Sequence, residues 1–144
     1  MPRRDTDPFG NYNFIVEIDG LEIAAFAEVS GLSSETEVIE YRDGNDKVNA
    51  VRKLPGLTKY SNITLKRGIT ASDDLWQWRK AIIDGNIDRR TASIVILNEA
   101  HEPVMRWLVL EAWPCKYDGP ALNAKGNEVA IESLTLACER IELN

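Results

Sequence analysis

Apolar and polar residues alternate along several short stretches of the chain, and alternation with a period of two predicts β-strands. The clearest stretch runs from Ser34 to Tyr41, and a second runs from Tyr60 to Lys66. Further strands are predicted at residues 14–18, 21–29, 91–98, 104–113 and 128–141. Asp19-Gly20 predicts a tight hairpin between residues 14–18 and 21–29, because a type I′ turn requires positive φ at both central positions.

One stretch follows a helical period instead. Three apolar residues lie three and four positions apart on one helical stripe, which predicts a helix packed on a core: Leu75, Trp78 and Ile82. A cap is expected at Thr70 or Ser72, and Gly85 is expected to close the helix. Trp76 points aside from the apolar stripe, so we interpret it as an interface residue.

Strands at short spacing with one helix predict a single domain over residues 1–144: an antiparallel β-barrel or sandwich with one flanking α-helix. Residues 1–12 are predicted to form an N-terminal arm rather than a helix or a strand. Residues 91–98 and 104–113 are apolar on both faces. We therefore expect each strand to be covered on one face by the barrel core and on the other by the helix or a neighbouring subunit. A proline- and glycine-rich link is predicted at residues 114–120.

The stretch 42–59 has no sustained period and contains Asp43-Gly44-Asn45 and Pro55-Gly56. It is predicted to be a long loop between strands. Structureless loops longer than about 12–15 residues are uncommon inside compact domains, and those that occur are usually functional or disordered. We therefore expect this loop to carry a function.

Charge is unevenly distributed along a chain whose formal net charge is −6. Residues 47–72 contain six basic residues and no acidic one, whereas both flanking parts are acidic. A molecule with opposite charges on different faces can bind a copy of itself head to tail, which gives closed rings or open stacks. A solvated basic loop explains the same charges, and both interpretations stay open on charge alone.

The sequence contains no motif that indicates catalysis. Phosphate-loop, dinucleotide, zinc-protease and nucleophile-elbow patterns are absent, and the single histidine, His101, lies in a predicted turn. We predict no catalytic residue, no cofactor and no metal. The acidic balance argues against nucleic acid binding by sequence readout, and no apolar run approaches the roughly 18 residues of a membrane span. Without a recognisable signal peptide, synthesis in the cytoplasm is expected.

A series of short motifs, in one order along nearly the whole chain, resembles the inner tail tube proteins of contractile phages and of extracellular contractile injection systems. The residues that carry this resemblance are Asp7-Pro8, Asn13-Phe14, 16–20, 26–32, 40–44, 52–56, 63–68, 75–78, Trp107, 112–114, Gly119-Pro120 and 127–132. One departure lies near the end of the chain. Many family members end with a His-Glu-Gly-like tail after their last strand, and this chain has Ala137-Cys138-Glu139-Arg140 instead.

The resemblance implies a hexameric ring that stacks on copies of itself into a rigid hollow tube for membrane puncture and cargo passage. The implied partners are the sheath protein, the baseplate hub and spike, a tube terminator and cargo in the lumen, and the mature location is a phage tail-like particle. Loop 42–59 is expected to reach an adjacent ring. The expected stacking residues are Arg42, Asp43, Lys47, Arg52, Lys53, Leu54, Pro55, Gly56, Leu57 and Lys59.

Two alternatives remain. A tube-initiator or baseplate-adaptor ring of the same family would share the barrel but would not polymerise. A soluble β-barrel that binds a small ligand through its tryptophans would be monomeric.

Overall fold

The computed structural model describes residues 4–19 and 26–144, which form nine strands and one helix. The helix is α1 (Asp74–Ile83). The strands are β1 (Phe14–Ile18), β2 (Glu28–Ser30), β3 (Ser34–Tyr41), β4 (Arg52–Tyr60), β5 (Ile63–Gly68), β6 (Arg90–Leu97), β7 (Pro103–Asp118), β8 (Ile131–Ala137) and β9 (Arg140–Leu143). The predicted mainly β fold with a single helix is confirmed for this part of the chain.

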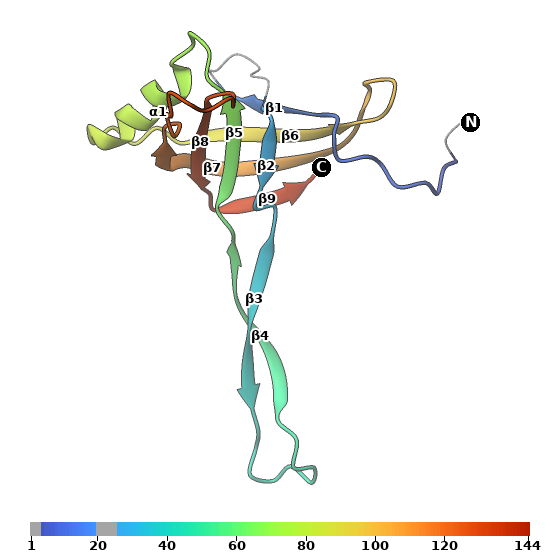
Figure 1. Ribbon diagram of the computed structural model, residues 1–144. Coiled ribbons are helices and arrows are strands. Elements are labelled where there is room, and N and C mark those ends of the chain that lie inside the picture. Colours follow the sequence, from blue (N-terminus) through green and yellow to red (C-terminus); the bar gives the residue numbers. More distant parts are fainter. Residues whose placement is uncertain (1–3, 20–25) are drawn as a thin grey trace.

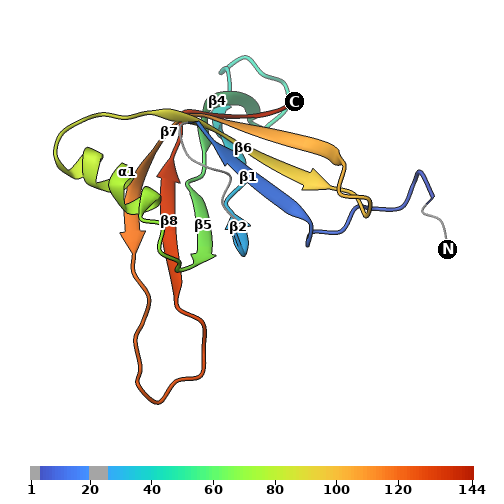
Figure 2. The same ribbon diagram turned by 90° about the horizontal axis from the view of Figure 1, so that it is seen from above.

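The body of the molecule is an antiparallel sheet that bends along β7, in the order β1-β6-β7-β8-β5-β2. The first part of β7 pairs with β6 and β9, and the last part, from Trp113, pairs with β8. Between them Glu111 has a φ of 53°, a value rare for residues other than glycine. This bend turns one sheet into the two layers of a sandwich (Figure 2).

The core lies between the two layers. Alternating residues of β5 and β8 point inward, as Ile63, Leu65, Leu134 and Leu136 are at most 1% exposed. The helix α1 packs beside β7 and adds Leu75 and Trp78 to the same cluster. The predicted barrel does not close, because β1 and β2 lie at opposite ends of the strand order and do not pair. A sandwich is therefore the better description.

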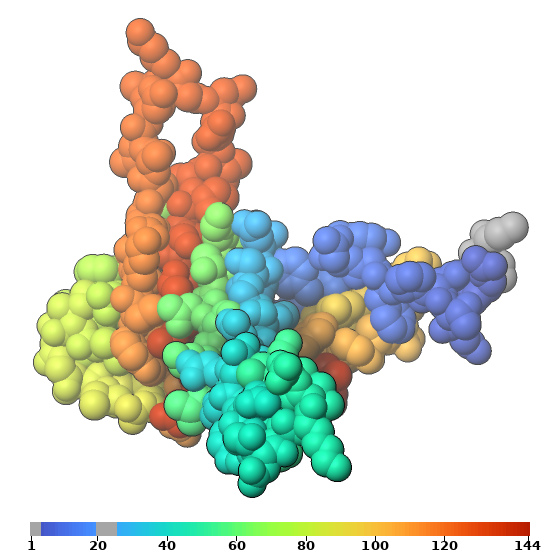
Figure 3. Space-filling model, turned by 90° about the horizontal axis from the view of Figure 1, so that it is seen from below, coloured from blue at the N-terminus to red at the C-terminus, as the bar shows by residue number. Residues whose placement is uncertain are grey.

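Three segments project from this body. The hairpin β3–β4 extends far below it in Figure 1, as a separate two-stranded sheet. The β7–β8 connection and the N-terminal arm extend in other directions, as Figure 3 shows from below, where the hairpin is seen end-on in front of the body. Residues 4–13, which precede β1, form neither a strand nor a helix.

The predicted loop 42–59 is wrong in its second half. Only residues 42–51 connect the strands, because Arg52–Tyr60 forms β4 and pairs with β3 along its whole length. A β-bulge hides this strand in the sequence: Gly56 and Leu57 together lie opposite Glu37, so the period of two shifts by one residue.

Other predicted boundaries also change. The strand predicted at 60–66 is divided, since Ser61 and Asn62 separate β4 from β5. Gly31 packs against the backbone of Asn62 at this point and has a φ of +99°. A Cβ on Gly31 would lie 2.1 Å from the carbonyl oxygen of Asn62. The link predicted at 114–120 lies largely within β7, where Pro114 is accommodated beside a register shift.

The predicted C-terminal strand 128–141 divides into β8 and β9. Asp73, rather than Thr70 or Ser72, is the N-cap of α1, and it makes no side-chain capping bond. Gly85 follows the end of α1 with a φ of +90°, as predicted. The Asp19-Gly20 turn and most of the strand predicted at 21–29 lie outside the described residues; β1 pairs with β6 and β2 with β5.

Candidate functional site

The hairpin β3–β4 is the most exposed element of the fold. All eight residues of β3 are exposed, and so are most of those of β4. The two strands are joined by antiparallel pairing and by a hydrogen bond of 2.9 Å between the hydroxyls of Thr36 and Thr58. An isolated two-stranded hairpin is marginally stable in water, so this element is expected to contact another molecule.

Apolar side chains gather on the hairpin. Seven of the seventeen exposed large hydrophobic residues of the described chain lie between positions 38 and 57: Val38, Ile39, Tyr41, Val48, Val51, Leu54 and Leu57. Leu57 is 71% exposed and Val48 68%. Such a concentration of exposed apolar side chains on one projecting element is typical of an interaction site.

The tip of the hairpin, residues 42–51, is held by its own polar contacts. Arg52 forms an ion pair of 2.7 Å with Asp46 and a longer one of 3.9 Å with Asp43. Arg42 donates hydrogen bonds to the carbonyl oxygens of Asp46 and Val48. The hydroxyl of Tyr41 donates to Asp43, and this hydrogen bond raises the pKa of Tyr41, with a smaller contribution from burial.

The structure therefore divides the predicted stacking residues into two groups. Arg42, Asp43 and Arg52 shape the tip through contacts within the chain. The others are on the strands or the tip with their side chains mostly toward solvent: Lys47, Lys53, Leu54, Pro55, Leu57 and Lys59. Gly56 is the bulge residue, and a Cβ at this position would lie 3.2 Å from the carbonyl oxygen of Glu37.

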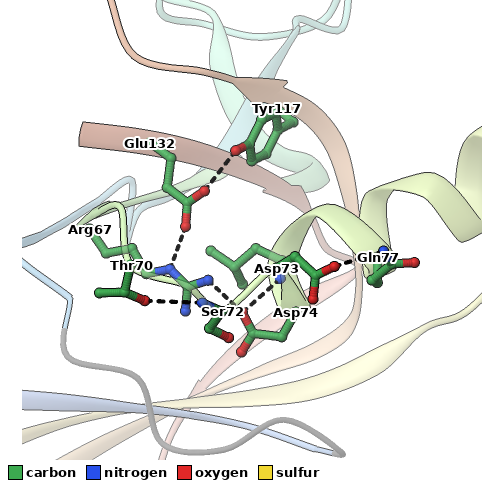
Figure 4. Close-up of polar contacts among 9 residues, drawn as sticks. Arg67, Thr70, Ser72, Asp73, Asp74, Gln77, Tyr117 and Glu132 are labelled. Atoms are coloured by element: carbon green, nitrogen blue, oxygen red, sulfur yellow. Dashed lines mark hydrogen bonds and ion pairs between the residues drawn. The ribbon is translucent and has the colours of Figure 1, made fainter. Parts of the chain in front are cut away.

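A second candidate site is a buried polar cluster between β5, β8, β7 and α1 (Figure 4). The guanidinium of Arg67 donates from Nε to Glu132 at 2.5 Å and from Nη2 to Asp74. Glu132 also accepts a hydrogen bond of 2.6 Å from the hydroxyl of Tyr117. Arg67 is 5% exposed and Glu132 6%, and these are the buried charged residues of the described chain.

The charges in this cluster compensate one another. Burial alone would lower the pKa of Arg67, but the hydrogen bonds to Asp74 and Glu132 raise it. Burial alone would raise the pKa of Asp74, and the hydrogen bond from Arg67 outweighs this and lowers it. No buried side-chain nitrogen or oxygen among the described residues lacks a hydrogen-bond partner. A cluster whose donors and acceptors are all engaged is a clamp that fixes α1 on the sheet.

The residues predicted on the helix fall on both sides of it. Leu75 and Trp78 are buried in the core, and the Trp78 indole donates a hydrogen bond of 2.8 Å to the carbonyl oxygen of Asp88. Ile82 is half-buried. Trp76 is 40% exposed and packs edge-on against Tyr117, with ring centroids 5.3 Å apart.

Metal ligands, pockets and apolar helices are the remaining features of interest in the described residues. They contain no group of three or more His, Cys, Asp or Glu placed to hold a metal ion. A pocket of about 370 Å³ lies between β1 and β2, lined mainly by apolar residues such as Phe14, Val29 and Trp107, and no residue of the Arg67 cluster lines it. Within residues 4–19 and 26–144, no helix is long and apolar enough to cross a membrane.

The Tyr117–Glu132 contact predicts a response to alkaline pH. The hydrogen bond to Glu132, assisted by burial, raises the pKa of Tyr117 from 10.0 to about 12. Because this pKa is raised in the folded state, its stabilising contribution is complete below pH 10 and is lost as the pH rises to about 12. Ultraviolet titration in the Tyr41→Phe background, which removes the other tyrosine whose pKa is raised, should show a late tyrosinate step that Tyr117→Phe removes. A late step that persists in the double variant would contradict the assignment.

Two parts of these sites were missed at the level of sequence. The acidic strand Ser34–Tyr41 was recognised as a strand, but its role as half of the projecting element was not. The acidic residues Glu35, Glu37 and Glu40 and the basic residues after position 51 have opposite charges. This complementarity could have indicated that the two segments pair. The Arg67–Glu132 pair joins residues 65 positions apart and left no local signal.

Comparisons with known proteins identify relatives over most of the chain. The family model of the T4-like virus tail tube protein gp19 matches residues 10–142. A comparison with curated protein sequences found no match. Among solved structures, a chain of the PVC sheath-tube complex in the extended state, an extracellular contractile injection system, is 31% identical, with a TM-score of 0.88 over 97% of this chain and 93% of that chain.

Two chains of the anti-feeding prophage are also similar. One comes from the structure of its tube terminating cap, with 31% identity and a TM-score of 0.87 over 100% of this chain and 95% of that chain. The other comes from its 6-fold symmetrised baseplate, with 26% identity and a TM-score of 0.84 over 96% of this chain and 97% of that chain.

Proposed function

Because the chain belongs to the family of the T4-like virus tail tube protein gp19, we propose that it is a structural subunit of the inner tube of a contractile injection particle. Copies of the chain form rings, and the rings stack into a rigid hollow tube. The tube crosses a target envelope, and cargo passes through its lumen. This role is structural and requires no catalytic step.

The projecting hairpin β3–β4 carries this proposal. The hairpin is exposed on both strands and displays seven large apolar residues. Exposed apolar area of this extent indicates that another molecule covers it. A second copy in the next ring gives it a partner. Because such a contact is head to tail, it continues as an open stack, and other proteins must terminate it.

The similar structures suggest the remaining partners. One is a sheath-tube complex, one a tube terminating cap and one a baseplate with six-fold symmetry. By this likeness we propose that the chain forms hexameric rings inside a sheath, between the hub and spike of a baseplate and a terminator. The mature protein is then part of an assembled phage tail-like particle.

The stacking contact is proposed to use the outward-facing residues of the hairpin. Lys47 and Lys53 make no ion pair within the part of the chain that is described, so their charge is available to an acidic surface. Leu54 and Leu57 supply apolar area beside them. Arg42, Asp43 and Arg52 serve the same contact indirectly, because their mutual contacts fix the shape of the tip.

A tube-initiator or baseplate-adaptor ring is the second candidate. The similarity to a chain of a baseplate structure, at a TM-score of 0.84, favours it specifically. Such a subunit shares the fold but meets the hub on one face, so it forms rings that do not stack.

Negative-stain electron microscopy of the purified chain, with light scattering, distinguishes these roles. Hollow tubes of uniform width are expected for the tube subunit. Single rings that never stack at any concentration would favour the initiator. A monomer that stays monomeric even with preassembled baseplates would contradict both.

A further inference from the structure

One layer of the body contains a row of side chains that runs from one of its ends to the other. Val29 of β2 lies opposite Leu65 of β5, which lies opposite Leu134 of β8. Leu134 in turn lies opposite Tyr117, on the last part of β7. Residues directly opposite in a sheet share a face, so all four belong to the core face. The two leucines are at most 1% exposed, whereas Val29 and Tyr117 at the ends are only partly buried.

At the Val29 end of the row lies the pocket between β1 and β2, with a volume of about 370 Å³. Part of its lining consists of apolar residues that pack against the core: Phe14, Val29, Leu32 and Trp107. Ala27 also lines the pocket and is exposed. Glu28 is the one charged residue among the described residues of the lining, and its ion pair with Lys66 is exposed on both sides. This end of the core is therefore open and apolar, with an acidic rim.

At the Tyr117 end the row continues onto α1. The indole of Trp76 packs edge-on against the Tyr117 ring, yet Trp76 stays 40% exposed. Arg79 and Lys80 follow three and four positions later, so they lie on the same side of the helix as Trp76. Arg79 bonds to the carbonyl oxygen of Pro114 and forms no ion pair with any described residue. This end thus presents an aromatic ring beside positive charge.

Trp76 cannot fill the pocket of its own chain. β8 and β5 separate β7 from β2, so three strand spacings of about 4.8 Å each lie between the two ends of the row. In Figure 1 and Figure 2, β8, β5 and β2 follow one another from left to right, across the direction in which the hairpin β3–β4 extends. Because the hairpin is proposed to join successive rings, the two ends of the row face neighbours within one ring. A cyclic ring joins one side of each subunit to a different side of the next.

We propose that Trp76 of each copy fills the pocket between β1 and β2 of the next copy in the ring. This inference rests on the proposed ring assembly and names a contact that holds one ring together. The indole extends the row beyond Val29, and the basic side of α1 lies against the acidic rim at Glu28. A tryptophan buries about 150–250 Å², and tryptophans in desolvated pockets are among the residues that dominate binding.

Moving the aromatic ring from the helix to the pocket tests this contact. Trp76→Ala removes the side chain that fills the pocket, and Ala27→Phe fills the pocket from within its own chain. Ala27 is exposed and borders free volume, so the larger side chain is accommodated. Each single change is expected to weaken every boundary of the ring about 30-fold or more. The chain with both changes is expected to regain rings, because the new ring at position 27 occupies the space that Trp76 has left.

The double variant separates this contact from a general loss of stability. If Trp76→Ala only weakened its own subunit, by removing the packing on Tyr117, a change at the other end of the row would not restore rings. Sedimentation velocity over a concentration series measures rings and monomers, and circular dichroism checks folding. Leu122→Ala, on the β7–β8 connection, removes another exposed apolar side chain and is expected to form rings as the wild type does.

More rings from the double variant than from either single variant support the proposal. Normal rings from Trp76→Ala or from Ala27→Phe overturn it and leave the proposed ring assembly intact. A double variant as weak as the two losses combined overturns it in the same way. Failure of the wild type to form rings would contradict the proposed function itself, and this inference with it.

Discussion

Replacing Lys47 and Lys53 together by glutamate is expected to give a folded protein that no longer forms tubes. Both side chains lie on the projecting hairpin and have no ion-pair partner among the described residues. If each meets an acidic group of the next ring, reversal changes attraction into repulsion. Truncating one partner of a desolvated charge pair typically costs about 2–5 kcal/mol, and this loss recurs in every subunit of a ring. Tube mass after high-speed sedimentation, checked by electron microscopy, measures the effect.

The choice of these two lysines follows from the structure. Arg52 is also a predicted stacking residue, but its ion pairs with Asp43 and Asp46 mean that its reversal would open the tip as well. A control with Arg89→Glu and Lys125→Glu changes the net charge by the same amount on exposed positions away from the hairpin. The control is expected to form tubes. Tubes of normal length from the hairpin variant would show that stacking does not depend on these charges.

Replacing Glu132 by alanine is expected to cause the largest loss of fold stability. The change removes one of the two carboxylates that hold Arg67, a side chain that is 6% exposed, and it also removes the acceptor of the Tyr117 hydroxyl. Breaking a buried ion pair by removing one partner typically costs about 3–5 kcal/mol, because the other charge stays buried without full compensation. Denaturant unfolding followed by circular dichroism measures this free energy.

Two further variants calibrate that result. Glu132→Gln keeps hydrogen-bond acceptors near Arg67 and is expected to lose less stability than the alanine variant. Glu28→Ala removes the partner of Lys66, the neighbour of Arg67 on β5, but that ion pair is exposed on both sides. Exposed pairs contribute about 0–1 kcal/mol. Equal losses for Glu132→Ala and Glu28→Ala would mean that the Arg67 cluster does not clamp α1 to the sheet.

The body of the fold could be predicted because its signals are local. The stripe Leu75, Trp78 and Ile82 predicted the helix, whose first two members are in the core. Gly85, with its positive φ, marked the end of the helix as glycine usually does. Alternation located β3 within its true bounds, since no bulge interrupts the period on that strand.

The second strand of the hairpin could not be predicted in the same way. Its bulge at Gly56 shifts the alternation, and Pro55 is a residue that argues against a strand in sequence. The pairing with β3 is visible only when both strands are placed side by side. The same limit applies to β7. The sequence predicts that this strand ends at Trp113, because a proline- and glycine-rich link follows, whereas the strand bends at Glu111 and continues beyond Pro114 with a register shift.

The two candidate sites differ in how much of each could be predicted from the sequence. The basic residues of 42–59 were identified as a contact surface from their charge and from the resemblance to a family. The division into tip-forming and outward-facing residues required the ion pairs of Arg52. The Arg67 cluster unites β5, β8, β7 and α1, and contacts between elements so distant in sequence arise only from the tertiary fold.

A cryo-electron microscopy map of tubes assembled from the purified chain tests most directly whether the hairpin β3–β4 joins successive rings. The account predicts hairpin density that crosses the boundary between rings, with residues 42–59 in contact with a subunit of the adjacent ring. A tube in which the hairpin folds back onto its own subunit, with no residue of 42–59 touching the next ring, would contradict it.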